Sequence, residues 1–387
     1  MITAIVTILM FLIMVSLHEF GHFITAKLMN FKILEYAIGF GPCIWKSKKS
    51  EIQYSLRMIP FGGYCKFEGE DDVSDDPRAF SNQAVWKRII VVAAGGIFNV
   101  ILGFLLFIVI ISQTSPMVTN KVESVVPKSY IAESGLMPDD EIIRINDKKV
   151  NFYNDITLYA QDFTENTECE LVIKRDGEKK TLNFKPTKST SVYKYQEDGI
   201  VVTSKINGVT TEDKFYPYGE DIEKDENLIG KEEKIERLII GFVPLKENVN
   251  AFNIWGECWN QTRFVVKLVY NSLWQMITGD IGIDQMSGPV GIVKEVNTAV
   301  NSGSNSWLYV LNLTALLTIN LGVFNLLPIP ALDGGRLFFM LIELITRKRI
   351  PPDKEGLVHG IGFMLLIALI IFVSYNDIMK HISVLGR

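Results

Sequence analysis

The chain has 387 residues, of which 48% are hydrophobic and 21% are charged, and its formal net charge is −5. Its mean hydropathy of +0.20 is too high for one water-soluble domain and too low for a bundle made only of membrane helices. The composition therefore predicts a few membrane spans plus a water-facing module, and the slight acidity gives no reason to expect nucleic-acid binding.

The first apolar run covers residues 2–28 and contains the motif His-Glu-Phe-Gly-His at 18–22. On a helix, His18 and His22 lie one turn apart on the same face, so both imidazoles can reach one zinc ion. Glu19 lies beside them and can take a proton from an attacking water. A carboxylate at that depth costs about 2.5–3.5 kcal/mol, which favours a functional site. The alternative is that both histidines are ordinary core residues that share this spacing by chance.

The next two stretches, 33–45 and 51–67, alternate apolar and smaller or polar residues, which predicts two β-strands. One interpretation is a small cytoplasmic hairpin sheet. The other is a sheet that dips beside residues 18–22, with a free edge able to pair with an extended substrate. This β region at 33–67 belongs to a first domain covering residues 1–112.

Residues 70–78 are acidic and predict a solvated loop, and 89–111 are long and apolar enough for a second span. Small residues at 93–96 (Ala-Ala-Gly-Gly) allow another helix to approach closely. Asn99 needs a hydrogen-bonding partner in the membrane, and we expect its role to be structural.

Residues 113–250 are mostly polar, and 134–148 resemble the PDZ pattern Gly-Leu-x-x-Gly-Asp-x-Ile-x-x-Ile-Asn-Gly. Asp139 and Asp147 replace its usual glycines at turns, where aspartate tolerates positive φ. We therefore expect one mostly β PDZ domain, interrupted by an insertion at about 187–234 that is rich in Lys, Glu, Asp and Gly. Its later strands are expected at 170–174, 180–184 and 237–244.

The region 251–307 begins with a Trp-rich amphipathic stripe at 252–277, which is suited either to a membrane interface or to packing on the PDZ domain. Residues 287–292 (Ser-Gly-Pro-Val-Gly-Ile) predict a break between elements.

The last region, 308–387, contains a third span at 308–327 and a fourth at 357–374. The third span ends in a segment with two prolines and two glycines, which prevent a regular helix from continuing. Unwound backbone at membrane depth is tolerated where it lines a protein cavity. Asp333 lies in this segment and is the best-placed third protein ligand for zinc, although it could instead be the N-cap of a following helix.

These motifs, taken in this order, resemble the site-2 protease family of intramembrane zinc metalloproteases, in particular the bacterial regulator-of-sigma-E protease type. The resemblance covers almost the whole chain. Its carriers are His18-Glu19-x-x-His22, Gly39-Phe40-Gly41-Pro42, Phe61-Gly62-Gly63-Tyr64, Ala94-Gly95 with Asn99, Gly288-Pro289-Val290-Gly291, and Asn325-x-x-Pro328-x-Pro330-x-Leu332-Asp333-Gly334.

By this resemblance His18, His22 and Asp333 bind Zn²⁺, Glu19 is the general base, and Asn325 helps to hold the substrate or its oxyanion. The implied fold is a multi-span α-helical membrane protein with four transmembrane helices, a membrane-associated β-hairpin sheet and one extracytoplasmic PDZ domain. The implied function is regulated intramembrane proteolysis of single-span proteins, such as anti-sigma factors and remnant signal peptides. Better-studied members carry two PDZ domains, so their two-domain gating need not apply here.

Two other functions are compatible with parts of the sequence: a catalytically inactive PDZ scaffold and a metal transporter. A complete motif with Glu19 argues against the scaffold, and the few polar residues within the spans argue against the transporter. Lysines and arginines concentrate between spans one and two and between spans three and four. By the positive-inside rule both loops face the cytoplasm of a bacterial cell, and the PDZ domain lies outside the cytoplasmic membrane.

Overall fold

The computed structural model describes residues 2–49, 51–70, 74–165, 167–218, 228–280, 282 and 288–385. Parts of the expected acidic loop (71–73), of the expected insertion (219–227) and of the expected break (287) lie outside these described residues. The chain divides into two compact units. Unit 1 comprises Met1–Ile110 and Gln261–Arg387, and unit 2 comprises Ile111–Asn260.

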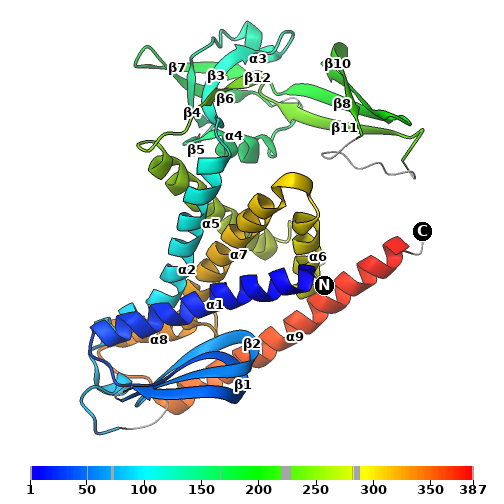
Figure 1. The fold of residues 1–387 in the computed structure, drawn as a ribbon. Helices are drawn as coiled ribbons and strands as arrows, with labels where there is room; N and C mark the ends of the chain where they lie inside the picture. Colours follow the sequence, from blue (N-terminus) through cyan, green and yellow to red (C-terminus); the bar gives the residue numbers. More distant parts are fainter. Residues whose placement is uncertain are drawn as a thin grey trace. The chain divides into compact units, whose positions relative to one another are not determined.

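Among the described residues, four helices are long and apolar enough to cross a membrane (Figure 1). They are α1 (Ile2–Leu28), α2 (Val85–Gln113), α7 (Ser306–Leu326) and α9 (Pro352–Leu385), the last over Asp353–Met379. Each predicted span coincides with one of these helices, and α2 and α9 extend beyond the predicted spans at both ends.

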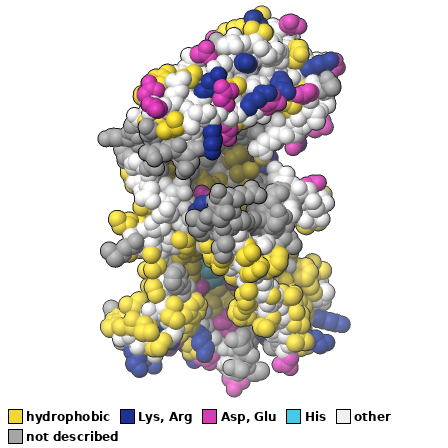
Figure 2. All heavy atoms as spheres, turned by 90° about the vertical axis from the view of Figure 1, so that its right-hand side faces the viewer, with side chains coloured by type: hydrophobic (Ala, Val, Ile, Leu, Met, Phe, Trp, Pro, Cys, Tyr) yellow, Lys and Arg dark blue, Asp and Glu magenta, His cyan; other side chains and the backbone are white. Residues whose placement is uncertain are grey.

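The surface of these helices is suited to lipid. Leu357, Met364 and Ile371 of α9 are 64–67% exposed, and hydrophobic side chains gather over unit 1 in Figure 2, whereas charged side chains of both signs cover unit 2. So large an apolar surface is unfavourable in water and is expected of a helix that faces a bilayer.

The predicted strands form an antiparallel hairpin of β1 (Ile33–Lys49) and β2 (Ile52–Phe67). Gly39, Gly41 and Gly62 have φ of 82–87° and bend both strands, so the hairpin folds into four paired segments. The order of the segments across the sheet is 43–49, 52–59, 33–40 and 63–67. In the described part of the chain, segment 63–67 has a strand partner on one side only and forms an edge of this hairpin sheet.

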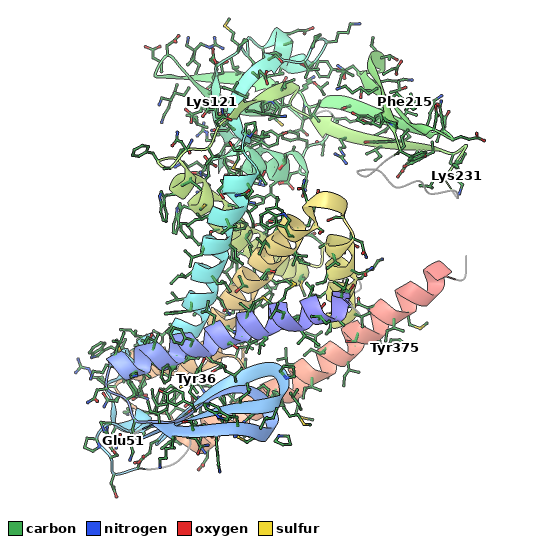
Figure 3. The ribbon with its side chains drawn as sticks, viewed as in Figure 1. Tyr36, Glu51, Lys121, Phe215, Lys231 and Tyr375 are labelled. Carbon is green, nitrogen blue, oxygen red and sulfur yellow. The ribbon has the colours of Figure 1, made fainter. Side chains whose placement is uncertain are left out.

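The hairpin sheet packs on α1. The Tyr36 hydroxyl, on the face toward α1 in Figure 3, donates to the Ser16 carbonyl at 3.3 Å, and its ring lies 4.9 Å from that of Phe23. Phe23, Phe31, Phe67, Phe80, Val91 and Met340 belong to one buried cluster that joins α1, β2, α2 and α8.

Helix α7 ends at Leu326, and the chain is unwound until α8 (Asp333–Thr346), the following helix that the alternative role of Asp333 as an N-cap implied. Asp333 is the first residue of α8 rather than its N-cap, which is Leu332.

The amphipathic stripe predicted at 252–277 forms α5 (Ile254–Thr278), and α6 (Pro289–Val300) follows it. The break predicted at 287–292 is wrong from residue 289 onward, because Pro289 at the first position starts α6. Short 3₁₀ turns occupy Phe80–Asn82 (η1) and Gly303–Asn305 (η3).

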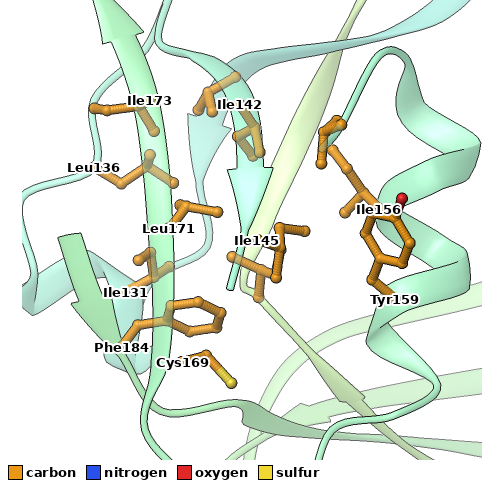
Figure 4. Packing of buried hydrophobic residues seen from close by; sticks show 13 residues of the cluster. Ile131, Leu136, Ile142, Ile145, Ile156, Tyr159, Cys169, Leu171, Ile173 and Phe184 are labelled. Atoms are coloured by element: carbon orange, nitrogen blue, oxygen red, sulfur yellow. The ribbon is translucent and has the colours of Figure 1, made fainter. Parts of the chain in front are cut away.

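Unit 2 contains a sheet of order β12-β3-β4-β6-β7, with β5 paired to β4. Its strands are β3 (Met117–Val125), β4 (Glu141–Ile145), β5 (Lys148–Lys149), β6 (Cys169–Arg175), β7 (Glu178–Phe184) and β12 (Phe242–Glu247), with helices α3 (Tyr130–Glu133) and α4 (Tyr153–Ala160). Ile131, Ile142, Leu171, Ile173 and Phe184 form the centre of its buried core (Figure 4). Cys169, Leu171 and Ile173, alternate residues of β6, face this core, as a half-buried sheet requires, whereas an irregularity in the pairing of β4 with β6 separates Ile142 and Ile145 by three residues.

The turn before β4 supports half of the expectation about the PDZ-like pattern. Asp139 has φ of 68°, as expected, but after β4 the positive φ of 49° belongs to Asn146 rather than Asp147. The buried Asp140 carboxylate accepts hydrogen bonds from the Arg175 guanidinium at 2.6 Å and from the Met137 amide at 2.8 Å, so it fixes this turn.

The expected insertion forms a second sheet, of order β10-β9-β8-β11. Its strands are β8 (Thr187–Tyr195), β9 (Gly199–Ile206), β10 (Val209–Pro217) and β11 (Glu232–Ile239). The single strand predicted at 237–244 is wrong: residues 237–239 end β11 and 242–244 begin β12. The chain changes sheet at Gly241, whose φ is 103°.

Candidate metal centre

The two histidines of the motif and Asp333 converge on one point in unit 1. His18 and His22 lie one turn apart on α1, and their Nε2 atoms are 3.2 Å apart. Asp333, at the start of α8, places its Oδ2 3.1 Å from Nε2 of His18 and 3.2 Å from Nε2 of His22. Each histidine is only 8% exposed. Thus three ligand-type atoms from opposite ends of the chain form a nearly equilateral, buried triangle.

This triangle fits zinc. Four ligands around zinc at about 2.0–2.1 Å lie about 3.3–3.4 Å from one another, close to the measured separations. Oδ2 of Asp333 is buried and, although within ion-pair distance of both imidazoles, has no hydrogen-bond donor in a suitable direction. A buried carboxylate oxygen left in this way is costly, and a bound cation would satisfy it.

Helix α2 contacts both imidazoles through their Nδ1 atoms. Nδ1 of His22 donates to the Val91 carbonyl at 2.9 Å, which leaves its Nε2 lone pair available for a metal. The side-chain amide of the fully buried Asn99 lies 3.3 Å from Nδ1 of His18. The sequence analysis correctly expected Asn99 to need a partner but did not identify His18.

Gly95 makes room for both rings. A Cβ at this position would lie 2.4 Å from Nε2 of His22 and 2.7 Å from Cε1 of His18. The small residues at 93–96 also allow close helix contact, as expected, because a Cβ on Gly96 would lie 2.8 Å from the Gly322 carbonyl oxygen of α7. The motif spacing gave no indication that Gly95 faces the histidines.

The unwound segment before α8 is held tightly. A Cβ on Gly334 would lie 1.8 Å from the Leu327 carbonyl oxygen, so only glycine fits there. The Ala331 amide, in a residue with φ of 77°, donates to Nδ1 of His359 on α9 at 3.1 Å. These contacts fix the direction in which Asp333 leaves the segment. His359 had not been singled out in the sequence.

Two cavities lie near the centre, and one of them is lined by Asp333. One, of about 370 Å³, is lined by charged side chains that include Arg88 and Glu343, and the other is lined by Asp333. Arg336 and His359 line both cavities. Cavities with polar linings of this kind can hold water, which hydrolysis consumes.

Glu19 faces the edge of the hairpin sheet. A Cβ on Gly63 would lie 3.3 Å from Cγ of Glu19, and the Cys65 backbone amide donates to the Glu19 carboxylate. Of the two interpretations of this β region, this contact favours the one in which the sheet lies beside the motif. Asn325 lies in the last turn of α7 and is half-buried.

Comparison with known proteins agrees with this geometry. Residues 6–369 match the family model described as Peptidase family M50. A "Putative zinc metalloprotease" of Clostridium acetobutylicum is 34% identical over 383 residues, covering 98% of each chain. A similarly named protein of Fusobacterium nucleatum is 30% identical, covering 98% of this chain and 99% of its own. The "Zinc metalloprotease RasP" of Oceanobacillus iheyensis is 27% identical, with the same coverage.

The alignments with these relatives cover nearly the whole chain. Their names describe zinc metalloproteases, not inactive scaffolds or metal transporters. The chain therefore belongs to peptidase family M50, the site-2 proteases, and is a membrane-associated zinc metalloprotease.

Proposed function

We propose that this zinc metalloprotease is an intramembrane endopeptidase that cleaves peptide bonds within the membrane-spanning segments of other proteins. One observation carries the proposal: the His18–His22–Asp333 triangle is built on α1 and on the first residue of α8, which follows α7 after a short unwound segment. Both α1 and α7 are apolar enough to cross a membrane. A site at that depth reaches bonds that a water-soluble protease does not.

In this proposal His18, His22 and Asp333 hold the zinc ion, and Glu19 is the general base. When bound, zinc supplies a Lewis acid that polarises the scissile carbonyl and makes water more acidic. Glu19 takes the proton from the attacking water and delivers it to the leaving amine. The role of Asn325 in holding the substrate or its oxyanion rests on the family resemblance.

The edge of the hairpin sheet could hold an unwound substrate segment beside Glu19. The carbonyl of a peptide bond in an α-helix is already hydrogen-bonded, so a helical substrate must unwind before it is cut. Segment 63–67 is a sheet edge directly beside Glu19. An unwound substrate segment could add to this edge as a further strand, which would place a peptide bond next to the general base.

The sheet and helices of unit 2 that surround the pattern at 134–148 support the assignment of a PDZ domain. By the positive-inside argument it lies outside the cytoplasmic membrane, and we propose that it excludes proteins that keep a large extracytoplasmic domain. Substrates would then be single-span proteins already trimmed outside, such as anti-sigma factors and remnant signal peptides.

Replacing about residues 118–244 by a flexible linker should keep zinc bound and extend cleavage to untrimmed substrates. Loss of cleavage of a short trimmed substrate would instead indicate a docking role.

The test uses purified full-length protein with a single-span substrate in lipid vesicles. Wild type should cut within the span, Glu19→Gln should bind zinc but not cut, and Asp333→Ala should lose both zinc and cleavage. A water-soluble unfolded protein serves as the competing substrate. Cleavage of only that protein, or wild-type cleavage by Glu19→Gln, would overturn the proposal.

A further inference from the structure

Asn99 is a fully buried polar residue on α2 whose side chain lies directly against the candidate metal centre. A buried amide in a membrane helix is unfavourable unless its hydrogen-bonding groups find partners. The observed neighbour is Nδ1 of His18, at 3.3 Å from Nδ2 of Asn99.

The arrangement of the two imidazoles determines which nitrogens carry hydrogen. Both Nε2 atoms point at Oδ2 of Asp333, so a metal would be bound through Nε2. A neutral imidazole that binds a metal through Nε2 has its hydrogen on Nδ1, where it requires an acceptor. His22 has one, the Val91 carbonyl at 2.9 Å. The corresponding hydrogen of His18 points at the amide of Asn99.

As placed, the Asn99 amide faces His18 with Nδ2, which is also a donor, while Oδ1 is buried without a partner. A half-turn of the amide exchanges oxygen and nitrogen with almost no change in shape. We propose that Oδ1 of Asn99 accepts the Nδ1 hydrogen of His18, so that Asn99 is the positioning residue that fixes this imidazole for zinc. This inference rests on the proposed role of His18 as a ligand.

Helix α7 packs against the backbone and the Cβ of Asn99. The fully buried Thr318 donates from Oγ1 to the Asn99 backbone carbonyl at 3.3 Å. A Cβ on Gly322 would lie 3.2 Å from Cβ of Asn99, so α7 packs directly against this residue. Because α7 also leads into the segment that carries Asp333, one helix supports both a ligand and the residue that orients another ligand.

The experiment measures zinc affinity of the purified full-length protein by competition with a chelator of known affinity. Asn99→Leu has nearly the same volume but no acceptor and should bind zinc about 10–100-fold more weakly. Asn99→Asp keeps an acceptor and should remain within a few-fold of wild type. Thr318→Val removes the contact to the backbone of Asn99 and should keep zinc affinity. If Asn99→Leu does not accumulate, Asn99→Ala takes its place.

A role in packing alone predicts the reverse order, because a buried leucine is tolerated in a membrane helix better than a carboxylate. Wild-type affinity in Asn99→Leu, a loss in Asn99→Asp as large as in Asn99→Leu, or an equal loss in Thr318→Val would each overturn the inference. His18→Ala separates the two proposals. If His18→Ala keeps zinc, the proposed ligand set is wrong. If His18→Ala loses zinc but Asn99→Leu binds zinc like wild type, only the role of Asn99 is refuted.

Discussion

Replacing Gly95 by alanine would test whether the space beside the two imidazoles is what allows the zinc site to form. The added Cβ would lie 2.4 Å from Nε2 of His22 and 2.7 Å from Cε1 of His18. Ordinary contacts between such atoms begin near ~3.5 Å, so the His22 ring must move by about 1 Å. Zinc–ligand distances vary by only about 0.2 Å, so we expect His22 to be lost as a ligand.

The size of the effect follows from the share of one ligand. Zinc binding to four-ligand protein sites is worth about 10–16 kcal/mol, or about 3 kcal/mol for each ligand. Losing one ligand should therefore weaken zinc binding by about two orders of magnitude. The fold itself should survive, because alanine favours a helix over glycine by about 1 kcal/mol.

The assay compares zinc content after dialysis against a chelator with the thermal unfolding of the protein without metal. Gly103→Ala is the matched control, because it introduces a similar clash on α2, 2.3 Å from Cγ1 of Ile319, away from the histidines. Gly103→Ala should lower the unfolding temperature and keep zinc. Gly95→Ala should keep the unfolding temperature of the metal-free protein and lose zinc. Wild-type zinc affinity in Gly95→Ala would refute the reasoning.

Three further changes have defined outcomes. Gly334→Ala should abolish zinc binding, since its Cβ would lie 1.8 Å from a carbonyl oxygen; metal analysis that found full occupancy would contradict this. Arg88→Met leaves the partly buried Glu343 carboxylate without its partner at 2.7 Å and should cost about 2–3 kcal/mol in detergent unfolding, which Arg88→Met with Glu343→Leu should largely recover. Hydrogen bonds from the Arg78 amide and from Lys32 lower the pKa of Asp76 to about 2, so its contribution to stability should be complete above about pH 4 and disappear as the pH falls toward 2. Hydrogen exchange of the loop should show this loss, and Asp76→Asn should not.

Local periodicity alone placed half of the candidate site. A helix brings residues four apart onto one face whatever surrounds it, so His18 and His22 could be paired from the sequence, with Glu19 beside them. Long apolar runs identified the four candidate spans for a similar reason, because length and composition determine whether a helix suits a bilayer. Alternation in the same way located the hairpin at 33–67.

The remaining features depend on contacts between segments that are distant in sequence. Asp333 could be chosen as a candidate, but only the packing of α8 and α1 places its Oδ2 3.1–3.2 Å from both imidazoles. The contacts of Gly95 and Asn99 with the histidines depend on the rotation of α2, and an apolar helix in a membrane carries little periodicity that would reveal it.

The second sheet of unit 2 was missed for a related reason. Burial in β8 and β9 does not alternate over most of their length, and charged residues are frequent in β10 and β11, so the period-2 pattern that marks a half-buried strand is absent. The pairing of backbone groups between neighbouring strands holds this sheet together, and such pairing leaves almost no trace in the order of the side chains.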